Sequence, residues 1–518
     1  MEITFDSLWQ LFAHSLDLWW VIVPAVVLGI IMGAVPGFAA HNTIIILLPF
    51  TLAVNVEVGL TFMIALYAAS HLGGGIPAIL VNIPGTGGAA ATTLDGHPMA
   101  QQGRAQQALM LCFFASVFGG LITSAATLFA MPYLAKVGFY MHSVEMVVVM
   151  LFGLTLIAVI AAQDTLKGLI AGFFGLILGA MGADHIYAAP RGTFGFLELF
   201  DGVPLIPALI GLFALSEAFV MIEQETILSR VGQERMQKST WKETIDSFFL
   251  AVKHWWEVIW TSIVGLVIGV TPGAGASIAA FVAYQQSRVF SKTPAGWPVP
   301  YFSRVFSKTP EKYGTGHPAG VIAPEAANNG VTSGTLVPLL ALGIPGGSTA
   351  AVMLIVLQYH GVPLGPRLFI ESPELAYGVF MSMVVAYIFM IFTILPMARY
   401  MSRVTLVPTK FLAPLITTFV IVGAFAPREY LFDMWLALAF GLIGYIARKT
   451  GYHVAAILIG VILGPLVEQS YLRALRIGGG DPLVLFSSTI GNILWALLVI
   501  SIALPYLNAW RKRRGHRR

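Results

Sequence analysis

The chain carries the same unusual interruption of its apolar sequence twice. Gly29 to Gly37 returns as Gly265 to Gly273, with Gly, Gly and a final Pro-Gly at identical spacing. A second pattern, Gly-x3-Pro-x6-Pro-Gly, begins at Gly73 and again at Gly334. Lipid cannot satisfy the backbone groups that a Pro-Gly break frees, so such breaks persist in a membrane only where protein encloses them. Paired interruptions in two corresponding halves are typical of the binding site of a secondary transporter.

Composition places most of the chain in a bilayer. Of the 518 residues, 57% are hydrophobic and 10% are charged, and the mean hydropathy is +0.82, whereas a soluble domain carries about 25% charged residues. Several apolar runs approach the roughly 20 residues that span a bilayer. We therefore expect an all-α polytopic membrane protein with about ten to twelve transmembrane helices. Two pseudo-symmetric, inverted repeats are expected, each with a broken helix and a re-entrant hairpin.

Polar stretches divide the chain into segments. The expected segments are a first membrane repeat over 1–222, a linker over 223–254, a second repeat over 255–508 and a basic tail over 509–518. The linker and the tail are rich in Lys and Arg, so the positive-inside rule places both in the cytoplasm. A basic tail directly after a spanning segment indicates topology, so no nucleic-acid partner is expected.

Residues 287–310 contain a tandem duplication. Ser287 to Pro294 is repeated letter for letter from Ser303 to Pro310. Surface loops tolerate added length at small entropic cost, so we interpret this segment as a loop insertion without chemistry of its own.

The broken helices are the first candidate site. A helix that starts after a break presents free N–H groups and a partial positive charge, which suit a carboxylate. Gly37, Asn42 and Gly273 are therefore predicted to contact substrate. The alternative is a proline-kinked helix whose small residues serve close packing, with Gly29-x3-Gly33 as an ordinary helix contact.

The second pattern predicts two hairpin tips. Two prolines seven residues apart followed by glycines cannot continue a helix, so 82–90 and 343–351 are expected to dip into the membrane. Two extracellular turns are the alternative. The substrate ligands predicted at these tips, chosen for their hydroxyl, amide or bare backbone groups, are Asn82, Gly85, Thr86, Gly346, Ser348 and Thr349.

A polar stretch from Pro318 to Ser333 lies just ahead of the second tip. Its carboxylate, amides and hydroxyls could coordinate a hard cation such as sodium or hold substrate. We predict Asn328 as a substrate ligand, and Glu325, Asn329, Thr332 and Ser333 as ion ligands. The alternative is a helix start, with Pro324 and Glu325 in its first turn.

Together these motifs resemble the large membrane permease subunit of the tripartite tricarboxylate transporters, the TctA-type family. The resemblance runs from about Leu18 to Leu507 and rests on Gly33 to Gly37, Ile76 to Thr86, Leu94 to Gly103, Pro272-Gly273, Ala323 to Asn329 and Leu342 to Gly346. It implies a bacterial inner-membrane symporter for carboxylates, coupled to a sodium or proton gradient. It also implies two partners, a small four-helix membrane subunit and a periplasmic solute-binding protein.

Two other functions remain open at this point. One is a stand-alone ion-coupled carboxylate carrier, and the other is a membrane enzyme that acts on lipid-linked substrates with Asp95, His97 and Glu325 as acid-base groups. The metal-protease, phosphate-loop and nucleophile-elbow motifs are missing from the sequence. We therefore expect a protein that is not an enzyme and needs no cofactor other than the coupling ion, Na⁺ or H⁺.

Overall fold

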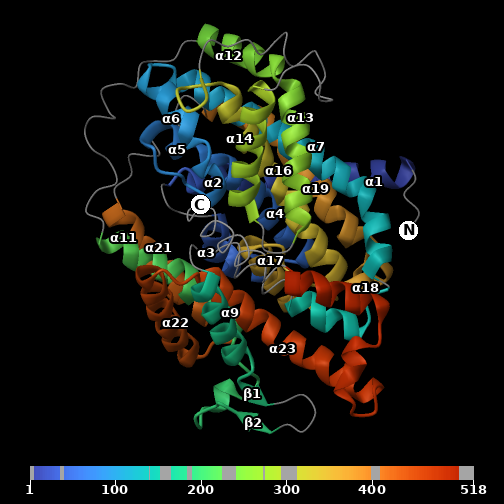
Figure 1. Cartoon of the computed structure of the whole chain (residues 1–518). Coiled ribbons are helices and arrows are strands. Elements are labelled where there is room, and N and C mark those ends of the chain that lie inside the picture. Colours follow the sequence, from blue (N-terminus) through green and yellow to red (C-terminus); the bar gives the residue numbers. More distant parts are fainter. Residues whose placement is uncertain are drawn as a thin grey trace, which may run out of the picture. The chain divides into compact units, whose positions relative to one another are not determined.

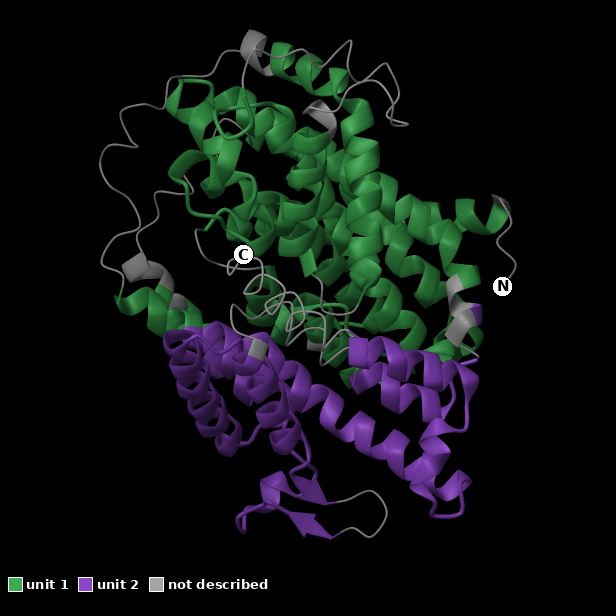
Figure 2. Cartoon of the chain, in the orientation of Figure 1, with its two compact units in different colours: residues 1–134, 217–419 green, residues 135–216, 420–518 purple. Residues whose placement is uncertain are grey.

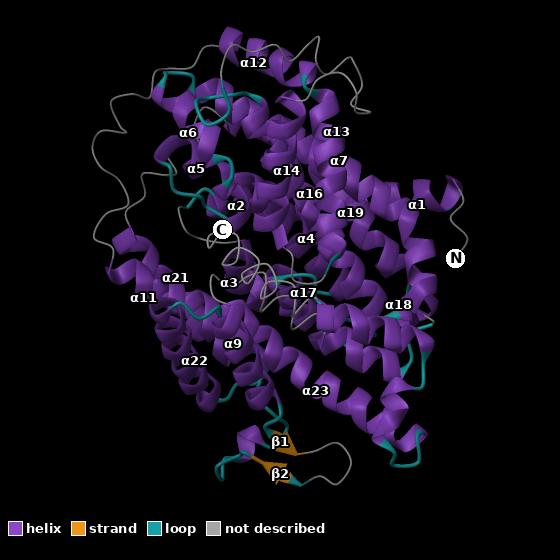
Figure 3. Ribbon diagram, viewed as in Figure 1, coloured by secondary structure: helices purple, strands orange, loops and turns teal. Residues whose placement is uncertain are grey.

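The computed structural model describes residues 5–35, 40–138, 140–151, 165–183, 189–223, 241–271, 275–292, 312–397 and 409–500. The described chain is almost entirely helical (Figures 1 and 3). It forms two compact units (Figure 2). Unit 1 contains Met1–Leu134 and Glu217–Phe419, and unit 2 contains Ala135–Ser216 and Val420–Arg518. Each unit therefore combines stretches from both halves of the sequence.

Unit 1 holds every residue of the predicted site. From the first half it takes α1 (Phe5–Asp17), α2 (Trp19–Gly33), α3 (Ala40–Leu52), α4 (Val56–Gly73), α5 (Gly75–Val81), η1 (Gly87–Ala90), α6 (Thr93–Gln101) and most of α7 (Ala105–Gly138). From the second half it takes α12 (Trp241–Lys253), α13 (Trp255–Val270), α14 (Gly275–Lys292), α16 (Ala319–Leu342), α17 (Ser348–Tyr359), α18 (Pro366–Glu371) and α19 (Pro373–Met397).

Six described helices are long and apolar enough to cross a membrane, and α1 with α2 makes a seventh if this pair, bent by 67°, is one span. An all-α polytopic membrane protein agrees with this finding. The expected ten to twelve full spans are not reached among the described residues. The reason is that prolines and glycines interrupt the apolar sequence and leave shorter helices of 10–17 residues, such as Trp255–Val270 and Ser348–Tyr359.

Glycines bring two pairs of helices into close contact. A Cβ at Gly33 on α2 would collide with the Ser70 backbone of α4, and a Cβ at Gly269 on α13 would press on Val331 of α16. Gly29 and Gly265, one turn earlier, make the same kind of approach. The packing role that the sequence offered as an alternative for these glycines is therefore real, and it occurs at equivalent places in both halves.

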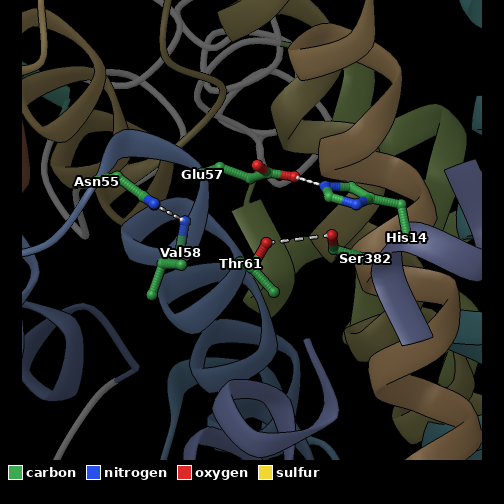
Figure 4. A network of polar contacts seen from close by, with 6 residues as sticks. All are labelled: His14, Asn55, Glu57, Val58, Thr61 and Ser382. Carbon is green, nitrogen blue, oxygen red and sulfur yellow. Dashed lines mark hydrogen bonds and ion pairs between the residues drawn. The ribbon is translucent and has the colours of Figure 1, made fainter. Parts of the chain in front are cut away.

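Helix α4 is fixed at its start by polar contacts (Figure 4). The Asn55 side chain caps the helix by accepting a hydrogen bond from Val58 N at 2.9 Å. Glu57 forms an exposed ion pair with His14 of α1, and Thr61 shares a hydrogen bond of 3.3 Å with Ser382 of α19.

The helices that precede the two predicted hairpin tips end in the same way. Asn82 closes α5 with a φ of 59°, and Gly343 closes α16 with a φ of 72°. In both turns the next N–H bonds back to a proline carbonyl, Ile83 N to Pro77 O and Ile344 N to Pro338 O. Asn and Gly are the residues that most readily adopt this left-handed conformation, so the local sequence accounts for the turn.

Unit 2 is also mainly helical. Its elements are α9 (Thr165–Gly179), β1 (Gly182–Ala183), β2 (Pro190–Arg191), η2 (Leu197–Leu199), α10 (Leu205–Leu209), the π-helical η3 (Ile210–Leu215), α22 (Leu431–Thr450), α23 (Val454–Ile477) and η5 (Pro482–Phe486). Two further helices, α11 (Ser216–Glu223) and α21 (Thr409–Phe425), cross from one unit into the other along the chain. Helices α9 and α23 cross closely at Gly175 and Gly460, and the two strands pair antiparallel.

Candidate functional site

The hairpin tip of each half lies against the broken helix of the other half. Gly87, at the first tip, has Ser277 of α14 as its nearest neighbour. At the second tip, the Ser348 hydroxyl lies 3.2 Å from His41 Nδ1 at the start of α3. Because Gly87 corresponds to Ser348 in the Gly-x3-Pro pattern, and His41 to Ser277 in the Pro-Gly pattern, the two contacts are equivalent. In unit 1, each tip therefore lies against the helix that follows the Pro-Gly break of the other half.

Glu325 lies at the centre of a buried polar network. Its side chain is fully buried on α16, and its two oxygens accept hydrogen bonds from first-half residues. Thr92 Oγ1 donates to Oε1 at 2.5 Å, and Ser116 Oγ donates to Oε2 at 3.1 Å. The Cys112 thiol, one turn before Ser116 on α7, bonds to the same carboxyl group. A carboxylate from the second half of the sequence is therefore held by donors from the first half.

Asn328 extends this network to α4. Its amide nitrogen donates a long bond of 3.5 Å to Glu325 Oε2, and a second bond to the backbone carbonyl of His71. Its amide oxygen lies 2.8 Å from His71 Nδ1. Gly88 of the first tip packs so closely on this oxygen that no Cβ would fit. The predicted substrate ligand Asn328 therefore has all of its amide groups engaged within the protein.

The other predicted ion ligands are also bonded internally. The Thr332 hydroxyl pairs with Tyr387 of α19 at 2.9 Å, and Tyr387 also lies 3.4 Å from Asn329 Oδ1. Asn329 Nδ2 donates to the Glu325 backbone carbonyl, and Ser333 Oγ makes a weak contact of 3.5 Å with the Gly330 carbonyl. All four predicted ion ligands are fully buried on α16. Asn329 and Thr332 meet at the Tyr387 hydroxyl, whereas the Glu325 carboxyl group faces Thr92 and Ser116.

Eight described residues have buried side-chain polar atoms without a hydrogen-bond partner, and three of the eight lie at a predicted helix break or hairpin tip. These three are Asn42 and Thr43 in the first turns of α3, and Thr86 at the first hairpin tip. Both the amide oxygen and the amide nitrogen of Asn42 are unpaired, although the residue is only 1% exposed. A buried polar group without a partner costs about 1–3 kcal/mol. Such groups gathered at a helix break and a hairpin tip indicate that a ligand or water satisfies them.

The remaining predicted ligands fall into two groups. Asn82 is exposed and forms the left-handed turn, while Gly85 is buried with its N–H bonded to the Gly74 carbonyl at 3.1 Å. At the second tip, Gly346 packs on Thr335, and Ser348 and Thr349 begin α17. Gly37 and Gly273 lie outside the described residues, as do the basic tail 509–518 and most of the duplicated segment.

Asp95 has a positioning role that the sequence did not reveal. An Asp-Gly pair is typical of a turn, but Asp95 lies inside α6 and is fully buried. Its Oδ1 accepts bonds of 2.8 Å from the N–H groups of Gly314, Gly316 and His317, and its Oδ2 accepts one of 2.9 Å from Tyr284. Four donors compensate the buried charge and fix the loop that leads into α16.

The same loop contains Tyr313, which bonds to Ser287 of α14 at 2.6 Å. Burial, together with the nearby Glu257, raises the pKa of Tyr313, so the phenol stays neutral. His97, the other acid-base candidate near Asp95, holds the Ile79 carbonyl through Nδ1 at 3.0 Å.

Sequence reasoning missed several members of the Glu325 network. Ser116 and Tyr387 lie in apolar helices, and Thr92 lies in the turn before α6, so no local pattern marked the three residues as ligands. The available signal was small: Cys112 and Ser116 are one turn apart, as are Tyr67 and His71, so each pair shares one face of an apolar helix.

Comparison with known proteins gives one family and two relatives. The model of the tripartite tricarboxylate transporter TctA family matches residues 18–459. A protein of Agrobacterium vitis, described as an uncharacterized 52.8 kDa protein in the TAR-I ttuC' 3' region, is 30% identical over 489 residues, which is 94% of this chain and 93% of that protein. A second, described as an uncharacterized protein in the TAR-II ttuC' 3' region of the same organism, is 29% identical over 250 residues, 48% of this chain and 97% of that protein. No solved structure matches this chain significantly.

Proposed function

Since the chain belongs to the TctA family of tripartite tricarboxylate transporters, we propose that it is the large membrane subunit of an importer for a carboxylate such as a tricarboxylate. Family membership and several long apolar helices make it a multi-pass membrane protein and a transporter component. The bacterial inner membrane and a cytoplasmic C-terminus are part of the proposal, based on the basic residues that end the chain.

The unpaired side chain of Asn42 is the observation that carries the proposed substrate site. An amide in the first turn of a helix can donate to a carboxylate beside the free N–H groups of that turn. Thr43 and Thr86 offer two further hydroxyls that lack partners. Ser348, Thr349 and the backbone at Gly37, Gly85, Gly273 and Gly346 would complete the site from the tips and breaks that meet in unit 1.

Ion coupling is proposed for the polar face of α16. Glu325 is its ionisable group, and Asn329, Thr332 and Ser333 follow it at one-turn spacings along the helix. Asn328 joins this face to His71 on α4. Either a proton or sodium could serve as the coupling ion in this arrangement, and inward movement of that ion would drive uptake of the carboxylate.

Two partners are proposed from the family name alone, a small membrane subunit and a periplasmic binding protein that delivers substrate. The experiment reconstitutes the purified chain into liposomes with and without these partners and measures uptake of labelled citrate, then of an aromatic carboxylate. Proton and sodium gradients are imposed singly.

Uptake that needs a gradient and both partners is the expected result. Uptake by the chain alone would instead identify a stand-alone carrier. If neither carboxylate is taken up under any condition, the proposed function fails.

A further inference from the structure

The contacts of Glu325 distinguish one coupling ion from the other. We infer that the ion carried by this site is a proton bound to the Glu325 carboxyl group, and that sodium has no site on α16. The inference rests on the proposed function for its transport role. Its geometric basis, and the experiment below, do not depend on any substrate.

The side-chain oxygen atoms on α16 that a cation would need already have partners within the protein. Sodium, like other hard cations, requires several oxygen ligands that face a common point. Here the Asn328 oxygen is held by His71 Nδ1, and the Asn329 oxygen lies beside the Tyr387 hydroxyl. Both Glu325 oxygens already face the donors Thr92 and Ser116. A cation would have to displace these donors one by one, whereas a proton requires only that a hydroxyl rotates.

The carboxyl group has hydrogen-bond partners in both of its charge states. In the ionised state, the Thr92 and Ser116 hydroxyls donate to it, and the 2.5 Å distance from Thr92 is that of a charge-assisted bond. After a proton adds to one oxygen, the new O–H can donate to the same hydroxyl, because a hydroxyl has one hydrogen and two acceptor lone pairs. Both states are therefore satisfied without any other atom moving far.

The surroundings of the site favour a change of charge at Glu325 rather than at a neighbour. The buried titratable groups on the elements around α16 are Tyr67 and His71 on α4, Cys112 on α7, Tyr377 and Tyr387 on α19, Asp95 on α6 and Tyr284 on α14, and two more, His97 on α6 and Glu257 on α13, are partly buried. Of these, Cys112 contacts the carboxyl group directly and His71 reaches it through Asn328. Among the described residues, no Lys or Arg forms an ion pair with Glu325. An unbalanced buried charge is costly, so proton binding is the available way to remove it.

The two hydroxyl groups that donate to Glu325 come from the other half of the sequence, and this affects how ion binding is coupled to the first hairpin tip. Thr92 directly follows the first hairpin tip and Ser116 belongs to α7, whereas Glu325 belongs to the second half. Gain or loss of the proton therefore changes the strength of a contact between the two halves of the sequence, from a charge-assisted bond to a weaker neutral one. Through Thr92, the carried ion is linked to the tip that presents Thr86.

The test is infrared difference spectroscopy of the full chain in liposomes during a pH titration. The carboxylic-acid carbonyl band that grows on acidification should contain a Glu325 component in the wild type, and Glu325→Gln should lack this component, whereas the other carboxyl groups of the chain contribute equally in both. Glu374→Gln, at an exposed carboxylate in the first turn of α19, is the matched control and should keep the Glu325 component. In parallel, sodium chloride should raise the melting temperature of the wild type no more than potassium chloride at equal ionic strength does.

A second variant covers the case in which Glu325→Gln fails to fold. Thr92→Val keeps the side-chain shape but removes one donor to the ionised carboxylate, so the midpoint of the Glu325 component should move to higher pH by about one unit. An unmoved midpoint would overturn the inference, as would identical bands in the titrations of the wild type and Glu325→Gln. A melting temperature raised by sodium alone, in the wild type but not in Glu325→Gln, would assign the site to sodium. Absent citrate uptake would count against the proposed function only.

Discussion

Two groups of buried polar side chains in unit 1 differ in how completely they are bonded. Around Glu325, each carboxyl oxygen and each amide group of Asn328 has a partner within the protein. At the start of α3 and at the first hairpin tip, Asn42, Thr43 and Thr86 have none. A bonded network stabilises the fold in the absence of any ligand, whereas unpaired groups gain their partners only when something binds. The difference separates residues that hold the two halves of the sequence together from residues that would hold a solute.

The bonded network should respond most strongly to Asn328→Ala. The substitution leaves His71 Nδ1 without its buried partner and opens a void beside Gly88, so the free energy of unfolding should fall by about 2–4 kcal/mol. Denaturant titration of the purified chain measures this fall. Asn55→Ala removes an exposed cap and should cost only about 1 kcal/mol. If both variants lose the same free energy of unfolding, the network around Glu325 contributes no more to stability than an exposed helix cap does.

Asp95→Asn should have the next largest effect. Asparagine keeps one oxygen for the three N–H groups of the loop, but its NH₂ group cannot accept the hydroxyl proton of Tyr284. We expect a loss of about 2 kcal/mol and faster proteolysis of the loop before α16. His97→Gln on the same helix is the control, and a matching change there would argue against a specific anchor at Asp95.

Thr86→Val tests the unpaired group at the first tip. Valine has nearly the same shape, and the hydroxyl that it removes has no partner, so stability should stay the same or rise slightly. Citrate uptake should fall by about tenfold, because one hydrogen bond to a charged solute is worth about 1.5 kcal/mol or more. Normal uptake combined with normal stability would remove Thr86 from the site.

The smallest effect is expected at the ion pair of His14 and Glu57, which lies on the surface of unit 1 (Figure 4). Exposed pairs contribute at most about 1 kcal/mol and are screened by salt. His14→Gln should therefore change the melting temperature little at physiological ionic strength and leave uptake unaltered. A large fall in the melting temperature would mean that the contact between α1 and α4 stabilises the fold more than an exposed ion pair normally does.

The sequence predicted the backbone features of the site better than its side-chain contacts. Pro-Gly breaks and left-handed turns are set by local residues, so the interruptions near Gly33 and Gly269 and the turns at Asn82 and Gly343 could be located. That each tip contacts the broken helix of the other half was not predicted, because the pairing joins residues more than 180 residues apart in the chain. The number of full-length spans was not predicted either, because a kinked or interrupted helix cannot be counted from hydropathy.

The side-chain contacts of the site could not be predicted, because the residues that form them lie far apart in the sequence. Thr92 and Glu325 are 233 residues apart, and nothing local indicates that a threonine after a hairpin will bond to that carboxylate. For the same reason the sequence indicated neither the bond between the Asn328 amide and His71 nor the loop contacts of Asp95. Whether a buried polar residue is free or engaged depends on tertiary contacts, which no single-chain pattern encodes.

The most direct test of the account is calorimetric binding of citrate to the purified chain, compared between the wild type, Asn42→Ala and Asn55→Ala. Asn42→Ala should bind citrate at least about tenfold more weakly while melting at the same temperature as the wild type or above it. Asn55→Ala should melt lower and bind citrate normally. Citrate binding that survives unchanged in Asn42→Ala, or that is lost equally in both variants, would contradict the assignment of the unpaired groups to the substrate.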